Sequence, residues 1–413
     1  MQLFKKSPFQ QEKKHTMQLK DKTLYSVFQP IYSFSNQSCI GAEVLVRGTH
    51  PVTGFQVPVA ECLEIPEDFN ASDYFYQLNA MHLNNWIDHK VPNAWLFINI
   101  EIASIKRLED LCLESLVREM TIHGREIVVE VVESEIRDEI LFKEIITQLR
   151  AIGCLIALDD FGAGHSNVDR IWKVEPDIVK LDRGVLVEAT KSLRSQNTLR
   201  NLVRLIKQSG SVCLLEGIET QDQALLAMDV GVDLVQGFYF ARPNALLEQV
   251  PKGEACIREV TEQYPAYLAE QKFVKNIQQK GYETLYENLD SCLTLQDLEE
   301  AMQERVSLSF VKRFFILNER GYQVSEENLK ENLDSRIEFM GKGKGLCWKN
   351  RRYFVQAKTY PEQLYVSEPY RSLIDMQLCL TLSKSMTLEG QLYVLCFDVF
   401  YHDKSAATVQ ISI

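Results

Sequence analysis

Short apolar runs alternate with amphipathic segments from residue 24 to about residue 240 of the chain. Apolar runs of this length without in/out alternation are typical of parallel strands that are covered on both faces. The pattern therefore predicts eight strands, over residues 24–32, 39–46, 95–100, 127–132, 154–158, 178–181, 212–215 and 234–240.

Helical segments with recognisable ends lie between several of these runs. The predicted helices cover residues 105–120, 139–152, 198–208 and 221–230. Glycines follow three of them, at Gly153, Gly210 and Gly231, and Thr220 precedes the last as an N-cap. Strands interleaved with helices in this number predict an α/β fold, a TIM-like (β/α)8 barrel of parallel strands rather than an open sheet.

The pattern changes after Pro243. Residues 247–304 are charged and helix-rich, and they predict a helical connector with an apolar stripe. Residues 305–413 predict an α+β domain with an antiparallel sheet, whose expected strands are RFFILN, RYFVQAKTY, QLCLTLSKSM and QLYVLCFDVFY. Residues 1–22 are polar and lysine-rich and predict a loose tail or a short leader helix, so the barrel is assigned to residues 23–246.

Composition narrows the class of protein. The chain has 413 residues, 46% of them hydrophobic, which is enough for two domains. A net charge of −12 argues against a nucleic-acid partner, although metal ions can still bring an anionic ligand to an acidic protein. The ten cysteines form no CxxC pair and predict reduced thiols. We find no signal-peptide pattern and no bilayer-length apolar run in the sequence, and we expect a soluble, cytoplasmic protein.

Polar side chains stand at or just past the ends of seven successive predicted strands. They are Glu43 and Arg47, Asn99, Glu130 and Glu133, Asp159 and Asp160, Lys180 and Asp182, Glu216 and Glu219, and Gln236. In a barrel of parallel strands these ends converge on one face, where the active site is built. One acidic residue at a strand end is usually a helix cap or part of a salt bridge, but seven polar ends in succession predict a site.

The residue types at these ends indicate a metal. The adjacent carboxylates of Asp159 and Asp160 repel each other and are costly to bury without a cation. Glu43, Asn99 and Glu130 add hard oxygen ligands, which select Mg²⁺ or Mn²⁺ over zinc. If Asp159 bridges and Asp160 reaches outward, two ions fit at about 3.5 to 4 Å, the spacing of two-metal phosphodiester hydrolysis.

Other polar residues suit an anionic substrate. Lys180 is predicted to orient the attacking water or to stabilise charge on the phosphate, and Glu216 is a candidate base or a supporter of the metal ligands. Arg47 should point to the same side of its strand as Glu43 and Leu45, where its guanidinium can clamp a phosphate.

Several motifs together resemble the EAL domain, the family of cyclic di-GMP phosphodiesterases, over roughly residues 24–246. They are EVL at 43–45, FQP at 28–30, FIN at 97–99, VEVVES at 129–134, LDDFGAGHSN at 158–167, PDIVKLD at 176–182, EGIET at 216–220 and QGFYFARP at 236–243. The chain departs from the family at Val44, which replaces alanine, and at Gly48, where an aromatic residue is common. The change at Gly48 could alter the wall of the substrate site.

The resemblance implies hydrolysis of cyclic di-GMP to linear pGpG with two ions of Mg²⁺ or Mn²⁺, in a homodimer formed through the barrel. It assigns the metal ligands to Glu43, Asn99, Glu130, Asp159 and Asp160, and the catalytic roles to Glu216 as general base, Lys180 and Glu43. It assigns nucleotide contacts to Arg47 and Leu45, the metal-water site to Gln236, and the positioning of the loop 160–167 to Glu219.

Two other functions stay open at this point. One is a catalytically silent cyclic di-GMP receptor. The retention of four residues argues against it, namely Glu43, Lys180, Glu216 and Glu219. The other is a barrel hydrolase of a different phosphodiester, such as a glycerophosphodiester. The aromatic residues 238–240 are interpreted as barrel packing rather than as a base-stacking platform.

The C-terminal domain resembles a PAS-like or Cache-like sensor on WKNRRYF at 348–354, SEPYRSL at 367–373 and YVLCFD at 393–398. This likeness implies a regulatory domain with a pocket for an unknown small ligand, lined by Trp348, Arg352, Tyr353, Tyr370, Arg371 and Asp398. The alternative is a domain that only dimerises and keeps its aromatic residues in the core.

Overall fold

The computed structural model describes residues 15–102, 105–132, 138–163, 168–245, 247–326, 328–329, 343–373 and 375–401, with residues 328–329 described by their backbone alone. The chain divides into two compact units, Met1–Tyr267 and Leu268–Ile413. Each unit has its own hydrophobic core.

The first unit is built from alternating strands and helices. Its strands are β1 (Thr16–Gln18), β2 (Thr23–Ser33), β3 (Ser38–Thr49), β4 (Gln56–Val57), β5 (Trp95–Asn99), β6 (Ile127–Val132), β7 (Leu155–Phe161), β8 (Ile178–Leu181), β9 (Val212–Leu215) and β10 (Leu234–Val235). Its helices are α1 (Val59–Leu63), α2 (Ala71–His89), α3 (Leu113–Glu119), α4 (Glu139–Ala151), α5 (Asp169–Val174), α6 (Arg183–Ala189), α7 (Leu193–Gln208) and α8 (Gln221–Val230).

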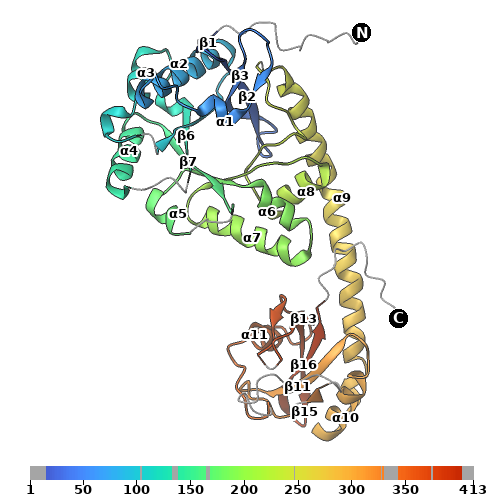
Figure 1. Cartoon of the computed structure of the whole chain (residues 1–413). Coiled ribbons are helices and arrows are strands. Elements are labelled where there is room, and N and C mark those ends of the chain that lie inside the picture. Colours follow the sequence, from blue (N-terminus) through green and yellow to red (C-terminus); the bar gives the residue numbers. More distant parts are fainter. Residues whose placement is uncertain are drawn as a thin grey trace. The chain divides into compact units, whose positions relative to one another are not determined.

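Eight of these strands close into a barrel, in the order β2, β10, β9, β8, β7, β6, β5 and β3, with β3 pairing back to β2. The labelled helices α3, α4, α5 and α7 lie outside the ring of strands (Figure 1). The predicted α/β barrel is confirmed, but the expectation that all its strands are parallel is wrong. Strand β2 runs antiparallel to both of its barrel neighbours, β3 and β10, whereas the other seven strands run parallel.

The helix ends follow the capping signals in the sequence. The predicted helix 221–230 is α8, whose N-terminus is capped by the Thr220 side chain and whose C-terminus is closed by Gly231 at φ 84°. The predicted helix 105–120 is shorter, because only a 3₁₀ turn (Leu108–Asp110) and α3 are helical. Helices α2 and α6 were not predicted.

The predicted strand 234–240 ends after two residues, at β10. The chain turns at Gly237, where an added Cβ would lie 2.1 Å from the Ile218 carbonyl oxygen. Only glycine allows this close backbone approach. The following aromatic residues therefore leave the sheet.

The chain before β2 differs from the predicted tail. Strand β1 pairs antiparallel with β2, and Met17 is buried in a small cluster with Leu24 and Val46. Residues 16–18 are thus part of the sheet, and residues 1–14 lie outside the described residues.

The second unit carries an antiparallel sheet. Helix α9 (Val250–Glu283) runs from the first unit into the second, followed by α10 (Leu295–Arg305), β11 (Val311–Asn318), β12 (Asn328–Leu329), α11 (Arg352–Thr359), β13 (Tyr365–Val366), β14 (Tyr370–Arg371), β15 (Leu378–Leu388) and β16 (Gln391–Phe400). The sheet order is β12, β11, β16, β15 and β13, with β14 also on β15.

This topology tests three predictions for the C-terminal part of the chain. The expected antiparallel neighbours 377–382 and 391–401 are confirmed as β15 and β16. The expected helices after residue 247 are confirmed as α9 and α10. The strand expected in RYFVQAKTY is wrong, because these residues form α11, which buries Tyr353, Phe354 and Ala357 at helical spacing.

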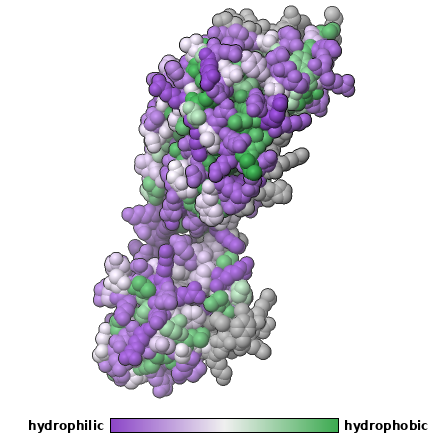
Figure 2. Space-filling model, turned by 90° about the vertical axis from the view of Figure 1, so that its left-hand side faces the viewer, coloured by the Kyte–Doolittle hydropathy of each residue, from purple (hydrophilic) through white to green (hydrophobic). Residues whose placement is uncertain are grey.

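All ten cysteines are free thiols, as predicted. In the part of the chain that the structure describes, no helix has an apolar stretch long enough to span a membrane. Polar and hydrophobic residues are interspersed over the face of the molecule in Figure 2.

Candidate active site

The seven parallel strands of the barrel bring the predicted polar residues together at their carboxyl ends. Glu43 on β3 is in register with Phe97 of β5, and Asn99 at the end of β5 is opposite Glu130 of β6. Parallel strands place such residues at one end of the barrel. The predicted convergence of strand ends is observed.

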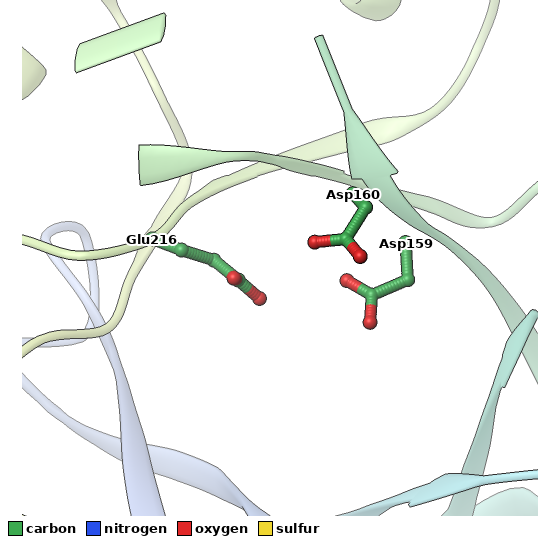
Figure 3. Close-up of side chains that lie close together, drawn as sticks. All are labelled: Asp159, Asp160 and Glu216. Atoms are coloured by element: carbon green, nitrogen blue, oxygen red, sulfur yellow. The ribbon is translucent and has the colours of Figure 1, made fainter. Parts of the chain in front are cut away.

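Two adjacent aspartates at the end of β7 reach the same site. In a regular strand neighbouring side chains point to opposite faces. Here the pairing of β7 with β8 shifts between Leu158 and Phe161, and Asp160 has a φ of 52°. This irregularity lets Asp159 and Asp160 lie with Glu216, one carboxylate oxygen from each within 4.8 Å of the others. Figure 3 shows the three side chains directed toward one another.

Lys180 lies at the centre of the carboxylates. Its Nζ lies 2.5 Å from Glu130 Oε1, 2.7 Å from Glu216 Oε1, 2.9 Å from Asp159 Oδ1 and 3.7 Å from Glu43 Oε2. The side chain is 1% exposed. One buried ammonium therefore contacts four carboxylates.

Two amide side chains orient the outer carboxylates. Asn99 Nδ2 donates to Glu130 Oε2 at 2.7 Å, and Gln236 Nε2 donates to Glu43 Oε2 at 2.8 Å. These bonds leave the amide oxygens as acceptors. Gln236 Oε1 is buried and has no hydrogen-bond partner among the described residues. An unsatisfied buried oxygen at this position fits a bound cation or a water.

The site has an excess of negative charge. Five carboxylates, of Glu43, Glu130, Asp159, Asp160 and Glu216, surround the single ammonium of Lys180. When all are ionised, four negative charges are uncompensated. A buried cluster of this kind must take up protons or cations.

The pKa shifts have the directions that this excess requires. Burial, which Lys180 opposes only in part, raises the pKa of the Glu216 carboxyl to about 8. Burial and the neighbouring carboxylates also raise the pKa values of Glu130 and Asp160. Burial opposes the charge on Lys180, but the surrounding carboxylates outweigh it and raise its pKa well above the usual range. Lys180 is therefore a permanent cation, and the carboxyl groups compete for further positive charge.

The donor set fits divalent metal ions. It consists of carboxylate and amide oxygens only, which are the ligands of Mg²⁺, Mn²⁺ and Ca²⁺ rather than of zinc. Carboxylate oxygens of Asp159, Asp160 and Glu216 lie within 4.8 Å of one another, and Gln236 Oε1 is a further acceptor without a partner among the described residues.

A cavity of about 220 Å³ opens beside the carboxylates. It is lined by Gln29, Glu43, Arg183, Glu216, Gly217, Glu219, Gln236, Gly237 and Phe238. Gln29 and Arg183 were not among the predicted site residues, although Gln29 is in the FQP motif and Arg183 directly follows PDIVKLD. Phe238 was interpreted as packing, whereas it is 44% exposed at the cavity and Phe240 is the buried aromatic residue.

Several predicted residues lie away from this cluster. Leu45 and Arg47 are half-buried on the same side of β3 as Glu43, as predicted, but neither lines the cavity. Asp182 caps α6 through Gly184 N. Gly48 does not face the substrate site, because an added Cβ would lie 2.7 Å from Cys62 Sγ in the core.

The predicted loop partner of Glu219 is only partly described. Glu219 Oε2 accepts a bond from Arg183 Nη2 at 3.0 Å. Residues 164–167 of the loop, like Glu133, lie outside the described residues. The positioning role of Glu219 stays a prediction.

Known proteins resemble this chain in sequence. Cyclic di-GMP phosphodiesterase RocR of Pseudomonas aeruginosa is 29% identical over 225 residues, which are 52% of this chain and 56% of that protein. Probable cyclic di-GMP phosphodiesterase PdeN of Escherichia coli is 27% identical over 241 residues, 55% of this chain and 45% of that protein. The chain thus spans about half the length of the curated relatives it matches.

A solved structure matches both units in fold. The Bacillus subtilis YkuI protein, with an EAL domain, was crystallised in complex with its substrate c-di-GMP and calcium. It is 19% identical, with a TM-score of 0.74 over 92% of this chain and 96% of that one. The sequence model of the EAL domain matches residues 12–243, more than half of the chain. The protein therefore belongs to the EAL-domain family.

Proposed function

We propose that the barrel hydrolyses cyclic di-GMP to linear pGpG with two divalent cations, Mg²⁺ or Mn²⁺. The observation that carries the proposal is the excess of four negative charges around Lys180, beside an open cavity. The names of RocR and PdeN and the ligand of YkuI support the choice of substrate.

Glu43, Asn99, Glu130, Asp159 and Asp160 would hold the cations. Bound divalent ions would neutralise charge on the phosphate and make a water more acidic. Two such ions carry four positive charges, which equals the excess negative charge of the cluster. This balance favours two ions over one.

The side chains of the site then have separate tasks. Glu216 takes the proton of the attacking water at a carboxylate oxygen, and its raised pKa places it near the range suited to a general base. Lys180, which stays protonated, stabilises the charge that develops on the phosphate. Gln236 orients Glu43, and Arg47 and Leu45 contact the nucleotide farther along β3.

Further parts of the proposal concern the whole protein. We assign regulation of the barrel to the C-terminal unit, dimerisation to the barrel surface, and a cytoplasmic location to the chain. The likeness of both units to YkuI supports a common two-unit architecture.

The test is turnover of cyclic di-GMP by the full chain with Mg²⁺ or Mn²⁺, beside the same chain in chelator, with pGpG resolved by chromatography. We expect metal-dependent pGpG. Binding without product in the metal-loaded chain would support a receptor instead. Hydrolysis of a glycerophosphodiester without competition by cyclic di-GMP would contradict the substrate assignment.

A further inference from the structure

A second cavity lies in the C-terminal unit. The residues of its lining that matter here are Arg313, Gln323, Trp348, Arg351, Tyr353 and Tyr370. Three of them, Trp348, Tyr353 and Tyr370, were predicted to line a ligand pocket. Arg352 and Arg371 were predicted too, but they are exposed and outside this lining, where Arg313 and Arg351 supply the positive charge instead.

The cavity admits only a small group. Its volume is about 20 Å³, and it opens to solvent. A ligand must therefore insert a compact head group and leave the rest of its body at the mouth. Trp348 and Leu373 contribute apolar surface to the lining.

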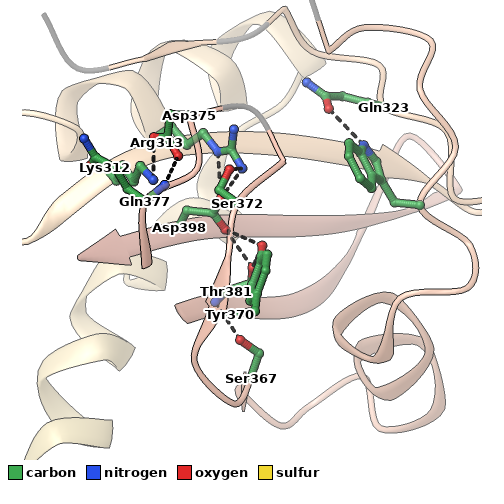
Figure 4. A network of polar contacts seen from close by, with 11 residues as sticks. Lys312, Arg313, Gln323, Ser367, Tyr370, Ser372, Asp375, Gln377, Thr381 and Asp398 are labelled. Carbon is green, nitrogen blue, oxygen red and sulfur yellow. Dashed lines mark hydrogen bonds and ion pairs between the residues drawn. The ribbon is translucent and has the colours of Figure 1, made fainter. Parts of the chain in front are cut away.

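The carboxylate of Asp398, which is bonded to Arg313 of the lining, is already satisfied. Asp398 Oδ2 accepts two bonds from Arg313, through Nε at 2.7 Å and through Nη2. Asp398 Oδ1 accepts the Thr381 hydroxyl at 2.7 Å, so that the Thr381 oxygen accepts the Tyr370 hydroxyl at 2.6 Å. Figure 4 shows this network. Arg313 and Asp398 balance each other in charge, and the hydroxyl hydrogen of Tyr370 is directed away from any ligand.

Two other donors of the lining have no such partner. The Tyr353 side chain is 5% exposed, and its hydroxyl makes no hydrogen bond to any of the described residues. Arg351 places its guanidinium carbon 5.8 Å from the ring centre of Trp348 and pairs with no carboxylate in the described parts of the chain. The Tyr353 hydroxyl is not among the fully buried polar atoms that lack a partner, so it is accessible from the cavity and can donate to a bound acceptor.

The two donors belong to one electrostatic environment. Burial raises the pKa of Tyr353, and the charges of Arg351 and Arg313 oppose the shift only in part. The hydroxyl therefore stays protonated and can donate a hydrogen bond to a bound acceptor. Asp398 compensates the charge of Arg313, so the positive charge of Arg351 is the uncompensated one in the lining.

We infer that this cavity binds a small organic monoanion through its carboxylate, which Arg351 and the Tyr353 hydroxyl hold while its apolar body lies against Trp348. A carboxylate matches the planar fork of arginine and accepts a second bond on its other oxygen. The inference does not depend on the activity of the barrel.

The test uses the full chain and a panel of acetate, propionate, pyruvate and benzoate, each beside its uncharged amide. Binding is measured by calorimetry and by the shift of the thermal unfolding transition. We expect at least one acid to bind and its amide to fail. Arg351→Gln and Tyr353→Phe should each weaken binding about tenfold or more, because each loses a hydrogen bond to a charged group.

Arg352→Gln is the matched control, because its side chain is exposed next to Arg351 but outside the lining. It should bind the acid like the wild type. Arg351 is itself exposed, so its variant tests binding without disturbing the core, and circular dichroism checks the fold of Tyr353→Phe.

Three results would overturn the inference. They are a panel in which no acid binds below about 10 mM, equally tight binding of acid and amide, and an unchanged affinity in Arg351→Gln. Binding of inorganic phosphate in place of the acids would also overturn the carboxylate assignment.

Discussion

The two units of the molecule bury charge in different ways. In the barrel one ammonium, that of Lys180, contacts four carboxylates. In the C-terminal unit the buried charges pair one to one, Lys312 with Asp375 at 2.5 Å and Arg313 with Asp398. All five of these named side chains are nearly inaccessible to solvent.

This difference distinguishes buried charges that only pair within the fold from buried charges that need a bound proton or cation. A balanced buried pair satisfies itself and needs no ligand, although it adds little to stability compared with an apolar pair. A buried excess of negative charge has no such internal solution and has to recruit protons or cations. Imbalance of buried charge, rather than buried charge as such, is what identifies the barrel site.

The largest effect is expected from removing the proposed base. Glu216→Gln keeps the size of the side chain but cannot take a proton, so turnover of cyclic di-GMP should fall by about 10² to 10⁴-fold. Binding of cyclic di-GMP, followed by calorimetry, should persist. The control is Glu188→Gln, an exposed residue paired with Lys191 on the surface. Loss of less than tenfold in turnover would refute the role of Glu216.

Removing one lysine from each unit should distinguish the carboxylates around Lys180 from the ion pair of Lys312 and Asp375. Lys312→Met leaves Asp375 buried without a partner and should lower the free energy of unfolding by about 3 to 5 kcal/mol, whether or not metal is present. Lys180→Met should destabilise the metal-free protein by a similar amount, but Mn²⁺ should restore most of the loss because it supplies the missing positive charge. Thermal unfolding with chelator or Mn²⁺ measures both. If Mn²⁺ restored the stability of both variants, or of neither, the proposed difference between the two units would be contradicted.

The pH dependence of stability should show whether the barrel site carries an excess of negative charge. Glu216 has a pKa of about 8 in the folded, metal-free protein against an ordinary value of 4.5, so the folded state binds this proton more tightly than the unfolded state. Its contribution to stability is present below about pH 4.5 and is lost as the pH rises through 8. In chelator, the wild type should therefore lose more stability between pH 5 and 9 than Glu216→Gln. Mn²⁺ should remove that difference, and parallel profiles in chelator would contradict the charge excess.

The smallest effect is expected at the rim of the site. Arg183 and Glu219 form an ion pair whose side chains are 55% and 39% exposed. Exposed pairs contribute up to about 1 kcal/mol, so Arg183→Gln should change the unfolding free energy by less than that. Metal binding should be unchanged. A loss of several kcal/mol in urea unfolding would show that the pair belongs to the buried cluster.

Much of the barrel could be predicted from the sequence, because buried strands and capped helices leave local signals. The apolar run 24–32 predicts β2, but the direction of a strand is not part of its own pattern, and β2 proved antiparallel. In RYFVQAKTY the aromatic and β-branched residues favoured a strand, while the spacing of Tyr353, Phe354 and Ala357 already fitted the helix α11. Gly237 ended β10 through a contact with Ile218, which is distant in sequence.

The candidate site was predicted in composition but not in geometry. Strand ends gave the carboxylates and Lys180, since each lies at a recognisable position on its strand. The contact of Lys180 with four carboxylates depends on the closure of the barrel, which is not visible in a local pattern. The approach of Asp160 to Glu216 depends on the irregularity at Asp160, which is not visible in one either. Arg183 was not predicted as a site residue, because a single arginine after a strand is usually a surface residue.

The most direct test of the account is the number of manganese ions bound per chain, measured by equilibrium dialysis of the full-length protein. Four uncompensated charges predict two ions in the wild type and fewer in Asp159→Asn, with no change in Asp375→Asn, whose charge was balanced by Lys312. A wild type that binds no manganese, or an Asp159→Asn variant that binds as much as the wild type, would contradict the account.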